Sequence, residues 1–302
     1  MRKNSIYILA ILVLALSGCR KEEVENQDND IVKYAVVLGN GPQSKGTLVN
    51  TSGSDASLSD FTETVKGFKV SAYNGAAATA LFSQTLNWSG SAWVADPVAF
   101  WPQATKLTFY AYANLPATGS SVTPASAGQT LTHTVPVAAI DQKDILLGYY
   151  KGSGGNTGMA EILFSHPLTA VVFKDAGLLD GKIVKSITLS GIGLSGSTTM
   201  DADGAIGDWN VTGYNGTASQ SKEGGLTVKD DVIGEPFIII PQNAGTYPIT
   251  VMVEMTDGTT MESTIGSGVL EAGKTNVFSI SVSAVHWLDI TYVSPWDVEN
   301  TI

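Results

Sequence analysis

The sequence is poor in cysteine, histidine and arginine, and each shortage excludes a class of protein. Cys19 is the one cysteine, so no internal disulfide can form and the fold must be stabilised by buried apolar surface. His133, His166 and His286 are the only histidines, and none has a second ligand at the spacing of a metal site. We therefore expect no metal site and no cofactor, and a structural role for each histidine.

The shortage of basic residues argues against nucleic acid as a partner. The chain has 17 Lys and Arg against 28 Asp and Glu, and no arginine follows Arg20. Binding to a phosphate backbone requires clustered Lys and Arg, which this sequence does not contain. The acidic excess, a formal charge of −11, indicates solubility.

Signatures of catalysis are also lacking. No Gly-x-Ser-x-Gly nucleophile elbow is present. Residues 191–196 match Gly-x-Gly-x-x-Gly, but the residues after them do not begin the helix that would bind a pyrophosphate. Asp201, Asp203 and Gly204 suggest a calcium loop, but the glycine comes too early for one, and a hairpin turn explains them better. We therefore predict that the protein is not an enzyme.

The first residues have the pattern of an export signal. An apolar run from Ile6 to Leu16 follows Arg2 and Lys3; it is too short to cross a bilayer core of about 30 Å and is typical of a secretory signal. The run closes in Leu16-Ser17-Gly18-Cys19, which resembles the lipobox of bacterial lipoproteins, where the chain is cut before an acylated cysteine. We expect residues 1–18 to be a signal peptide and Cys19 to be lipidated; a plain signal with an incidental cysteine is the alternative.

Residues 19–30 are charged and poor in apolar groups, which is typical of a flexible tether. Within them, Arg20-Lys21-Glu22-Glu23 resembles the short tag that directs some Gram-negative lipoproteins to the outer face of the outer membrane. A merely solvated linker is an equally good interpretation. The tag interpretation places the protein at the cell outer membrane, anchored by lipid and exposed at the surface.

Beyond the tether, almost every apolar run has the alternation or β-branched composition of a strand, and none has the pattern of a long helix. Turn-forming pairs such as Asp257-Gly258 separate these runs. The predicted fold class is all-β, with two β-sandwiches. The predicted strands are Val32–Leu38, Phe68–Tyr73, Leu107–Tyr112, Ile145–Tyr149, Leu168–Phe173, Ile183–Leu189, Phe237–Ile240, Ile249–Met255, Val277–Val282 and Leu288–Val293.

A glycine-rich stretch at residues 152–156 is the best internal break. It is either a domain joint or a long hairpin loop, and composition does not separate the two. We place a domain boundary near residue 158. The N-terminal β-sandwich then covers residues 31–158 and the C-terminal one residues 159–302.

Aromatic residues gather in the first of these regions. In a sandwich core their rings are buried, whereas on an exposed face they would form a platform on which sugars stack. The core is the preferred interpretation. The cluster comprises Trp88, Trp93, Phe100, Trp101, Phe109, Tyr110 and Tyr112.

Short motifs spread over the chain, in this order and behind a lipobox, resemble those of the fimbrillin-like family, the subunits of type V pili. Each motif is weak alone, and together they are specific. They are Phe100-Trp101-Pro102 with residues 107–112, residues 144–148, residues 164–171 (Phe-Ser-His-Pro-Leu-Thr-Ala-Val), residues 187–191, Ile240-Pro241-Gln242, residues 270–274 and Ser294-Pro295-Trp296.

The resemblance implies two transthyretin-like, Greek-key β-sandwich domains and a role in adhesion as a subunit of a surface fimbrium. It also implies that a protease removes the first strand and that a strand of a neighbouring subunit fills the groove. The partners are then other pilus subunits and the outer membrane, through lipid on Cys19. A lipid-anchored surface protein that binds a host ligand or glycan is the alternative.

The strand to be removed would be residues 31–38, and we expect the donor strand within residues 287–296. Leu288, Ile290 and Tyr292 alternate there with more polar residues, which makes one face apolar. The alternative is that this segment is simply the last strand of its own sandwich.

Family members commonly carry an arginine after the first strand, where a protease cuts. Here Lys45 stands where that arginine is expected, so processing could use Lys45, another site, or not occur.

Overall fold

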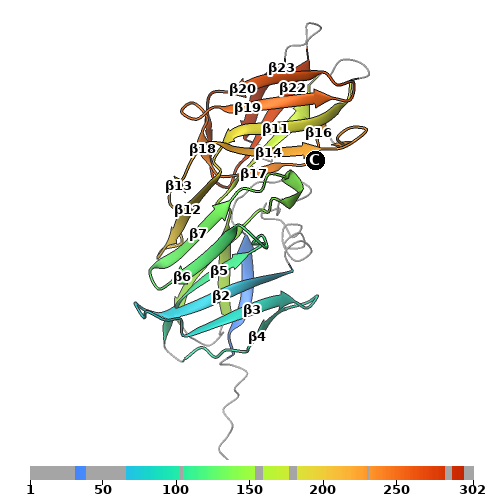
Figure 1. Ribbon diagram of the computed structural model, residues 1–302. Coiled ribbons are helices and arrows are strands. Elements are labelled where there is room, and N and C mark those ends of the chain that lie inside the picture. The colour runs from blue at the N-terminus through green and yellow to red at the C-terminus, as the bar shows by residue number, and fades with distance from the viewer. Residues whose placement is uncertain are drawn as a thin grey trace, which may run out of the picture.

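The computed structural model describes residues 31–38, 66–102, 105–153, 159–176, 182–229, 231–282 and 288–295. These residues form an elongated molecule built almost entirely of strands (Figure 1). Within them, the one helical element is a 3₁₀ turn at Ala139–Asp141, and no helix is long and apolar enough to cross a membrane. The predicted all-β fold class is confirmed.

A seven-stranded sheet forms the lower half of the molecule in Figure 1, in the order β1-β9-β8-β5-β2-β3-β4. All neighbours are antiparallel except β1 and β9, which are parallel. Its strands are β1 (Lys33–Leu38), β2 (Gly67–Asn74), β3 (Phe82–Trp88), β4 (Trp93–Asp96), β5 (Lys106–Ala113), β8 (Leu146–Ser153) and β9 (Met159–Ser165).

A second sheet occupies the middle of the molecule and joins early and late parts of the chain. Its order is β13-β12-β7-β6, from β6 (Ser120–Ala125), β7 (Gly128–Thr134), β12 (Ser195–Asp201) and β13 (Asn210–Val211). β7 and β12 pair antiparallel from Gly128↔Asp201 to Thr134↔Ser195. The Gln129 side chain ties this sheet to the lower one, since its Nε2 donates to the carbonyls of Ala111 and Gly148 at 3.0 and 3.1 Å.

The upper half is a sandwich of two larger sheets (Figure 1). One sheet has the order β15-β16-β10-β22-β23, with β17 also paired to β10, and the other has the order β14-β11-β19-β20. The strands are β10 (Thr169–Asp175), β11 (Val184–Ile192), β14 (Gly216–Ser221), β15 (Val228–Lys229), β16 (Val232–Ile233), β17 (Phe237–Ile239), β19 (Ile249–Met255), β20 (Thr260–Ile265), β22 (Thr275–Val282) and β23 (Leu288–Pro295), beside a small pair of β18 (Gln242–Asn243) and β21 (Val269–Leu270).

The expected boundary at residue 158 falls between two strands of the lower sheet. β8 and β9 pair antiparallel, from Leu147↔Ser165 to Tyr149↔Leu163, so residues 154–158 connect adjacent strands. The hairpin interpretation of the glycine-rich stretch therefore matches the pairing. The chain first enters the upper sheets at β10.

The buried apolar residues form two clusters, one in each half. The lower cluster is rich in aromatic rings and includes Phe68, Phe109 and Phe164. The upper cluster is mainly aliphatic and extends down to Leu131 and Met200 of the middle sheet. Apolar alternation explains most of their members, since every second residue of such a strand faces the core, whereas Thr169–Phe173 of β10 are all buried.

The predicted hairpin at Asp257-Gly258 is confirmed. β19 and β20 pair from Ile249↔Ile265 to Glu254↔Thr260. Gly258 has φ +87°, a left-handed conformation that glycine adopts without strain. The Asp257 carboxylate accepts the Thr259 N–H at 2.9 Å, which closes the turn.

His133 of β7 is buried within the middle sheet. Its Nδ1 lies 2.7 Å from the Ser120 hydroxyl, its ring packs edge-on against Trp209 at 6.5 Å between centroids, and its Nε2 is buried. Burial lowers the pKa of His133 to about 4. The imidazole is therefore neutral in the folded state at neutral pH.

We predict that protonation of His133 in the unfolded chain destabilises the fold in acid. Above pH 6.5, the ordinary pKa of histidine, His133 is neutral in both the folded and the unfolded chain. Between pH 6.5 and about 4, only the unfolded chain takes up the proton. The free energy of unfolding should fall by about 3 kcal/mol over that range through this group. Urea unfolding at a series of pH values measures it. His133→Gln should show a shallower dependence, and equal slopes in the two proteins would contradict the assignment.

Candidate assembly site

The residues predicted for processing and assembly fall partly within the described structure. Cys19 and Lys45 lie outside the described residues. Leu288, Ile290 and Tyr292 lie on β23, whose backbone is described. The site is therefore built from β1, the groove that β1 occupies, and β23.

β1 lies at an edge of the lower sheet. It pairs only with β9 along its length, in parallel, from Lys33↔Met159 to Leu38↔Phe164. Just before β1, the Val32 N–H donates to the Ala99 carbonyl at 3.1 Å. The beginning of the strand is thus held from both sides, by β9 and by the segment after β4.

Val32, just before β1, and the first residues of β1 alternate between the core and solvent. Val32 and Tyr34 are buried and belong to the lower cluster, Val36 packs against that cluster, and Lys33 is exposed. Burial of an apolar side chain of this size contributes about 1.5–3 kcal/mol. β1 therefore acts as an apolar ridge that fills a groove in the lower core.

The Tyr34 ring reaches deep into that groove. It meets Phe68 of β2 edge-on at 6.2 Å and Phe109 of β5 at 6.3 Å between centroids. Its hydroxyl donates to Oε1 of Gln84 on β3, fifty residues away in sequence. Burial raises the pKa of Tyr34, so the hydroxyl keeps its proton and remains a donor.

Sequence reasoning missed the Tyr34–Gln84 pair. The available signal was weak: Gln84 is the polar residue at an inward position of β3, two residues before the buried Leu86. A buried amide must find partners, but the sequence does not say that one of them is fifty residues earlier.

β23 lies at the opposite end of the molecule, at an edge of the upper sheet. It pairs antiparallel with β22, from Val282↔Leu288 to Asn276↔Pro295, and a bulge falls beside Val277 and Phe278. The predicted donor segment therefore pairs within its own chain, as the alternative interpretation requires. Its donation to another copy stays a prediction.

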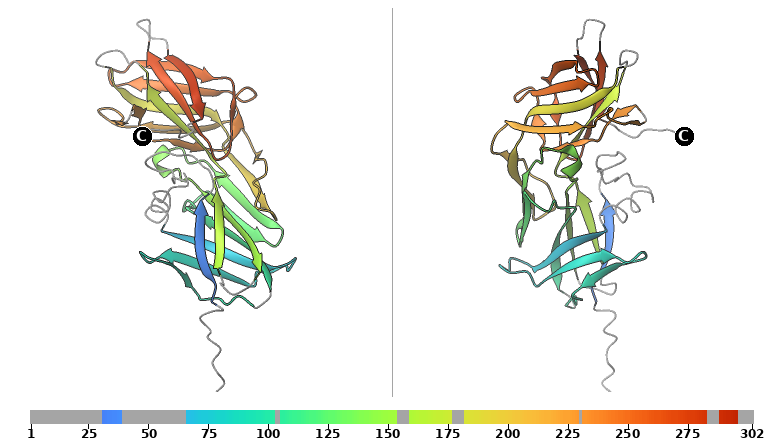
Figure 2. Two further views of the ribbon diagram at one scale, coloured as in Figure 1. Left: turned by 180° about the vertical axis from the view of Figure 1, so that it is seen from behind. Right: turned by 45° about the vertical axis from the view of Figure 1, so that its right-hand side comes forward.

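The two edge strands face the same side of the molecule. Seen from behind, β1 lies in the lower half and β23 in the upper half (Figure 2, left).

The aromatic cluster divides between core and surface. Trp101, Phe109 and Tyr110 are buried, in agreement with the core interpretation. Trp88 and Trp93 face each other across the β3–β4 hairpin at 5.1 Å and are partly exposed, but Trp93 also packs on Phe68 at 5.0 Å.

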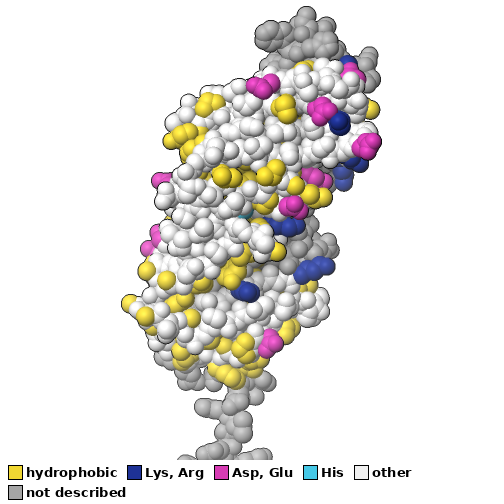
Figure 3. All heavy atoms as spheres, viewed as in Figure 1, with side chains coloured by type: hydrophobic (Ala, Val, Ile, Leu, Met, Phe, Trp, Pro, Cys, Tyr) yellow, Lys and Arg dark blue, Asp and Glu magenta, His cyan; other side chains and the backbone are white. Residues whose placement is uncertain are grey.

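Apolar side chains gather on the surface near this hairpin, at the lower end of the molecule (Figure 3). Val94, Val98 and Phe100 are about half exposed there. Nothing else in the described residues links this surface to a particular ligand.

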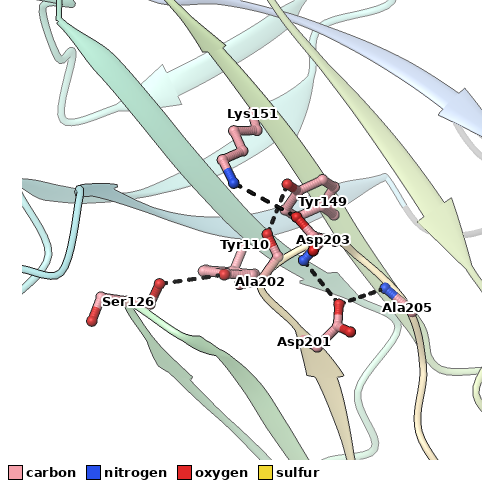
Figure 4. A network of polar contacts seen from close by, with 8 residues as sticks. All are labelled: Tyr110, Ser126, Tyr149, Lys151, Asp201, Ala202, Asp203 and Ala205. Carbon is pink, nitrogen blue, oxygen red and sulfur yellow. Dashed lines mark hydrogen bonds and ion pairs between the residues drawn. The ribbon is translucent and has the colours of Figure 1, made fainter.

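The segment considered as a calcium loop is a hairpin turn (Figure 4). The Asp201 carboxylate accepts the N–H groups of Asp203 and Ala205 at 2.8 and 2.9 Å, and these hydrogen bonds lower its pKa. The Tyr149 hydroxyl donates to the Ala202 carbonyl at 2.9 Å, and Lys151 Nζ lies 3.6 Å from Asp203. The turn thus anchors β12 to β8 of the lower sheet.

The remaining candidates from the sequence are the glycine motif at residues 191–196 and two of the histidines. Residues 191–196 connect β11 to β12, so a strand rather than a helix follows the glycines. His166 is buried with its Nδ1 2.8 Å from the Asp144 carboxylate, and His286 lies outside the described residues. In the part of the chain that the structure describes, no three or more His, Cys, Asp or Glu side chains are grouped to hold a metal ion.

Comparison with known proteins gives one family and several similar structures. The fimbrillin-like family matches residues 49–296. A candidate cell adhesion protein from Bacteroides ovatus has a TM-score of 0.60 and 14% identity, over 90% of this chain and 99% of that chain. Another from Bacteroides uniformis has a TM-score of 0.56 and 15% identity, over 88% and 98%. At these identities the similarity shows a shared fold; no curated protein matches.

We predict that Tyr34→Phe destabilises the protein although it keeps the ring. The change leaves the Gln84 oxygen without the hydroxyl in a buried site, which costs about 1–3 kcal/mol of unfolding free energy. Lys33→Ala, on the exposed side of the same strand, is the control and should change stability by less than about 0.5 kcal/mol. Urea unfolding of the full chain compares them; equal stability of the two variants would show that the hydroxyl contributes nothing.

Proposed function

Because the chain belongs to the fimbrillin-like family, we propose that it is a structural subunit of a cell-surface pilus and supports adhesion. The finer parts of this proposal are export as a lipoprotein, anchoring at the outer membrane, and polymerisation by strand donation. The protein would then act through its surfaces and edges rather than through catalysis.

The pairing and packing of β1 in the lower sheet is the single observation that carries the proposal. This strand forms the sheet edge and pairs with one strand along its length, and Tyr34, together with Val32 just before the strand, fills an apolar groove. Removal of such a strand exposes unpaired N–H and C=O groups of β9 above an apolar surface. An incoming extended segment satisfies both at once, which is β-strand addition.

We propose β23 of a second copy as the incoming segment. It is an edge strand, its pairing with β22 is interrupted by a bulge, and its sequence alternates apolar and more polar residues, which gives it one apolar face. Because β1 and β23 lie in opposite halves, the contact is head-to-tail and propagates along a filament.

Lys45 remains the candidate processing site. It follows β1 in sequence, so cleavage after it would separate residues 31–38 from the rest of the chain. A molecule that keeps β1 would retain its lipid and serve as an anchor or a capped end. Cleaved molecules would extend the filament.

We predict that deletion of residues 287–302 stops incorporation of the subunit into polymers. The deletion removes β23 and leaves the groove of the lower half unchanged. The measurement is the ladder of detergent-resistant polymers in unheated samples of the cell surface. A deletion of residues 24–30, which keeps Cys19 and the four residues after it and lies outside the donor, is the control. Normal polymers from the truncated chain would refute the donor assignment.

We predict two amino termini among surface molecules. Anchored molecules should begin at an acylated Cys19, and assembled molecules should begin near Gly46, after the loss of β1. Mass spectrometry of the amino-terminal peptides distinguishes the two. Cys19→Ala should remove the acylated species. Assembled polymers whose subunits all retain residues 31–38 would contradict strand replacement.

A further inference from the structure

We propose that Gln84 sets the register of the donated strand: Tyr292 of a second copy takes the place of Tyr34 and donates its hydroxyl to the Gln84 oxygen. This inference rests on the proposed function, since it concerns the groove that β1 leaves. It adds to that function a residue that selects one alignment of the incoming strand among several.

The orientation of the Gln84 amide is determined by its second partner. Nε2 of Gln84 donates to the Pro97 carbonyl, and Oε1 accepts from Tyr34. The amide cannot rotate to offer its nitrogen to the groove without losing the bond to Pro97. The groove therefore presents an acceptor at this point, and its occupant must bring a donor.

The cost of leaving this acceptor without a donor is high because Gln84 is only 4% exposed. An unsatisfied buried carbonyl loses its hydrogen bonds to water and forms none with the protein. When β1 departs, water can enter the open groove. When another strand closes the groove, the Gln84 oxygen needs a hydroxyl or amide from that strand.

Few side chains can supply the donor. Gln84 lies on β3, and β9, β8, β5 and β2 separate β3 from β1 in the sheet order, so a side chain from the β1 position must cross the core. Tyr34 does so between Phe68 and Phe109, in edge-on contact with both. Serine and threonine are too short for this, and charged side chains would be buried among aromatic rings.

The sequence of β23 contains one tyrosine, Tyr292. If Tyr292 stands opposite Ala160, as Tyr34 does, the residues two positions away on the same face are Ile290 and Ser294. With the strand parallel to β9, Ile290 replaces the buried Val32 and Ser294 replaces the half-buried Val36. The reverse direction would bury Ser294 at the Val32 position, so the parallel direction is favoured.

Other registers are disfavoured by the same groups. A shift by one residue turns Asp289, Thr291 and Val293 toward the core. A shift by two residues places Ile290 or Ser294 before Gln84, and neither reaches its oxygen with a donor. A single buried polar contact thus specifies the alignment, as a buried asparagine does in a coiled coil.

The test is a double-mutant cycle on polymers assembled by full-length chains. Tyr292→Phe and Gln84→Met each leave one polar partner buried alone, and each should speed the loss of subunits from polymers in hot detergent by about tenfold. The double variant lacks the Tyr292–Gln84 pair but still leaves the Pro97 carbonyl without its Gln84 donor, so it should lose subunits no faster than Gln84→Met alone rather than at the product of the two single effects. Tyr247→Phe, which removes the hydroxyl of an exposed tyrosine in the upper half, is the control and should match the wild type.

Two results separate failure of this inference from failure of the proposed function. If the 287–302 deletion stops assembly but Tyr292→Phe polymers are as durable as wild-type polymers, Gln84 does not set the register, and strand donation stands. If the deleted chain still assembles, both proposals are overturned. Additive single effects in the cycle would also overturn the inference, since they would mean that Tyr292 and Gln84 act independently.

Discussion

The lower half of this molecule depends on the contact between one edge strand and an aromatic core. β1 enters the sheet parallel to β9, while every other pair in that sheet is antiparallel. β1 is the first strand of the sheet in sequence, whereas its partner β9 comes after β8, so the pair is long-range and no hairpin joins the two strands.

The sequence was sufficient for the fold class and for the strands with strong apolar alternation. Residues 249–255 and the turn at Asp257-Gly258 follow the expected pattern, because their inward residues are Ile, Val and Met. The strands of the middle sheet were not predicted. β12 has the sequence Ser-Gly-Ser-Thr-Thr-Met-Asp, whose inward positions include Gly196 and Thr198, so its alternation is hidden among small polar residues.

The candidate site could be located from the sequence only in part. The resemblance to the fimbrillin-like family pointed to the first and last strands, and the structure places both at sheet edges. The groove itself could not be predicted, because it is assembled from Phe68, Gln84 and Phe109, which belong to three different strands. The glycine-rich stretch had two interpretations for a similar reason: composition shows a break in regular structure but not which strands lie on either side.

The ladder between β7 and β12 has a mechanical consequence. The chain also passes directly from β9 of the lower sheet into β10 of the upper sheet, so a pull between the two halves would load both this covalent link and the ladder. Seven residue pairs, from Gly128↔Asp201 to Thr134↔Ser195, would then share the tension. A Cβ on Gly128 would lie 2.4 Å from the Met200 carbonyl oxygen, so even an added methyl group would separate the two strands at that end. The glycine thereby keeps the tensile link between the two halves in close contact.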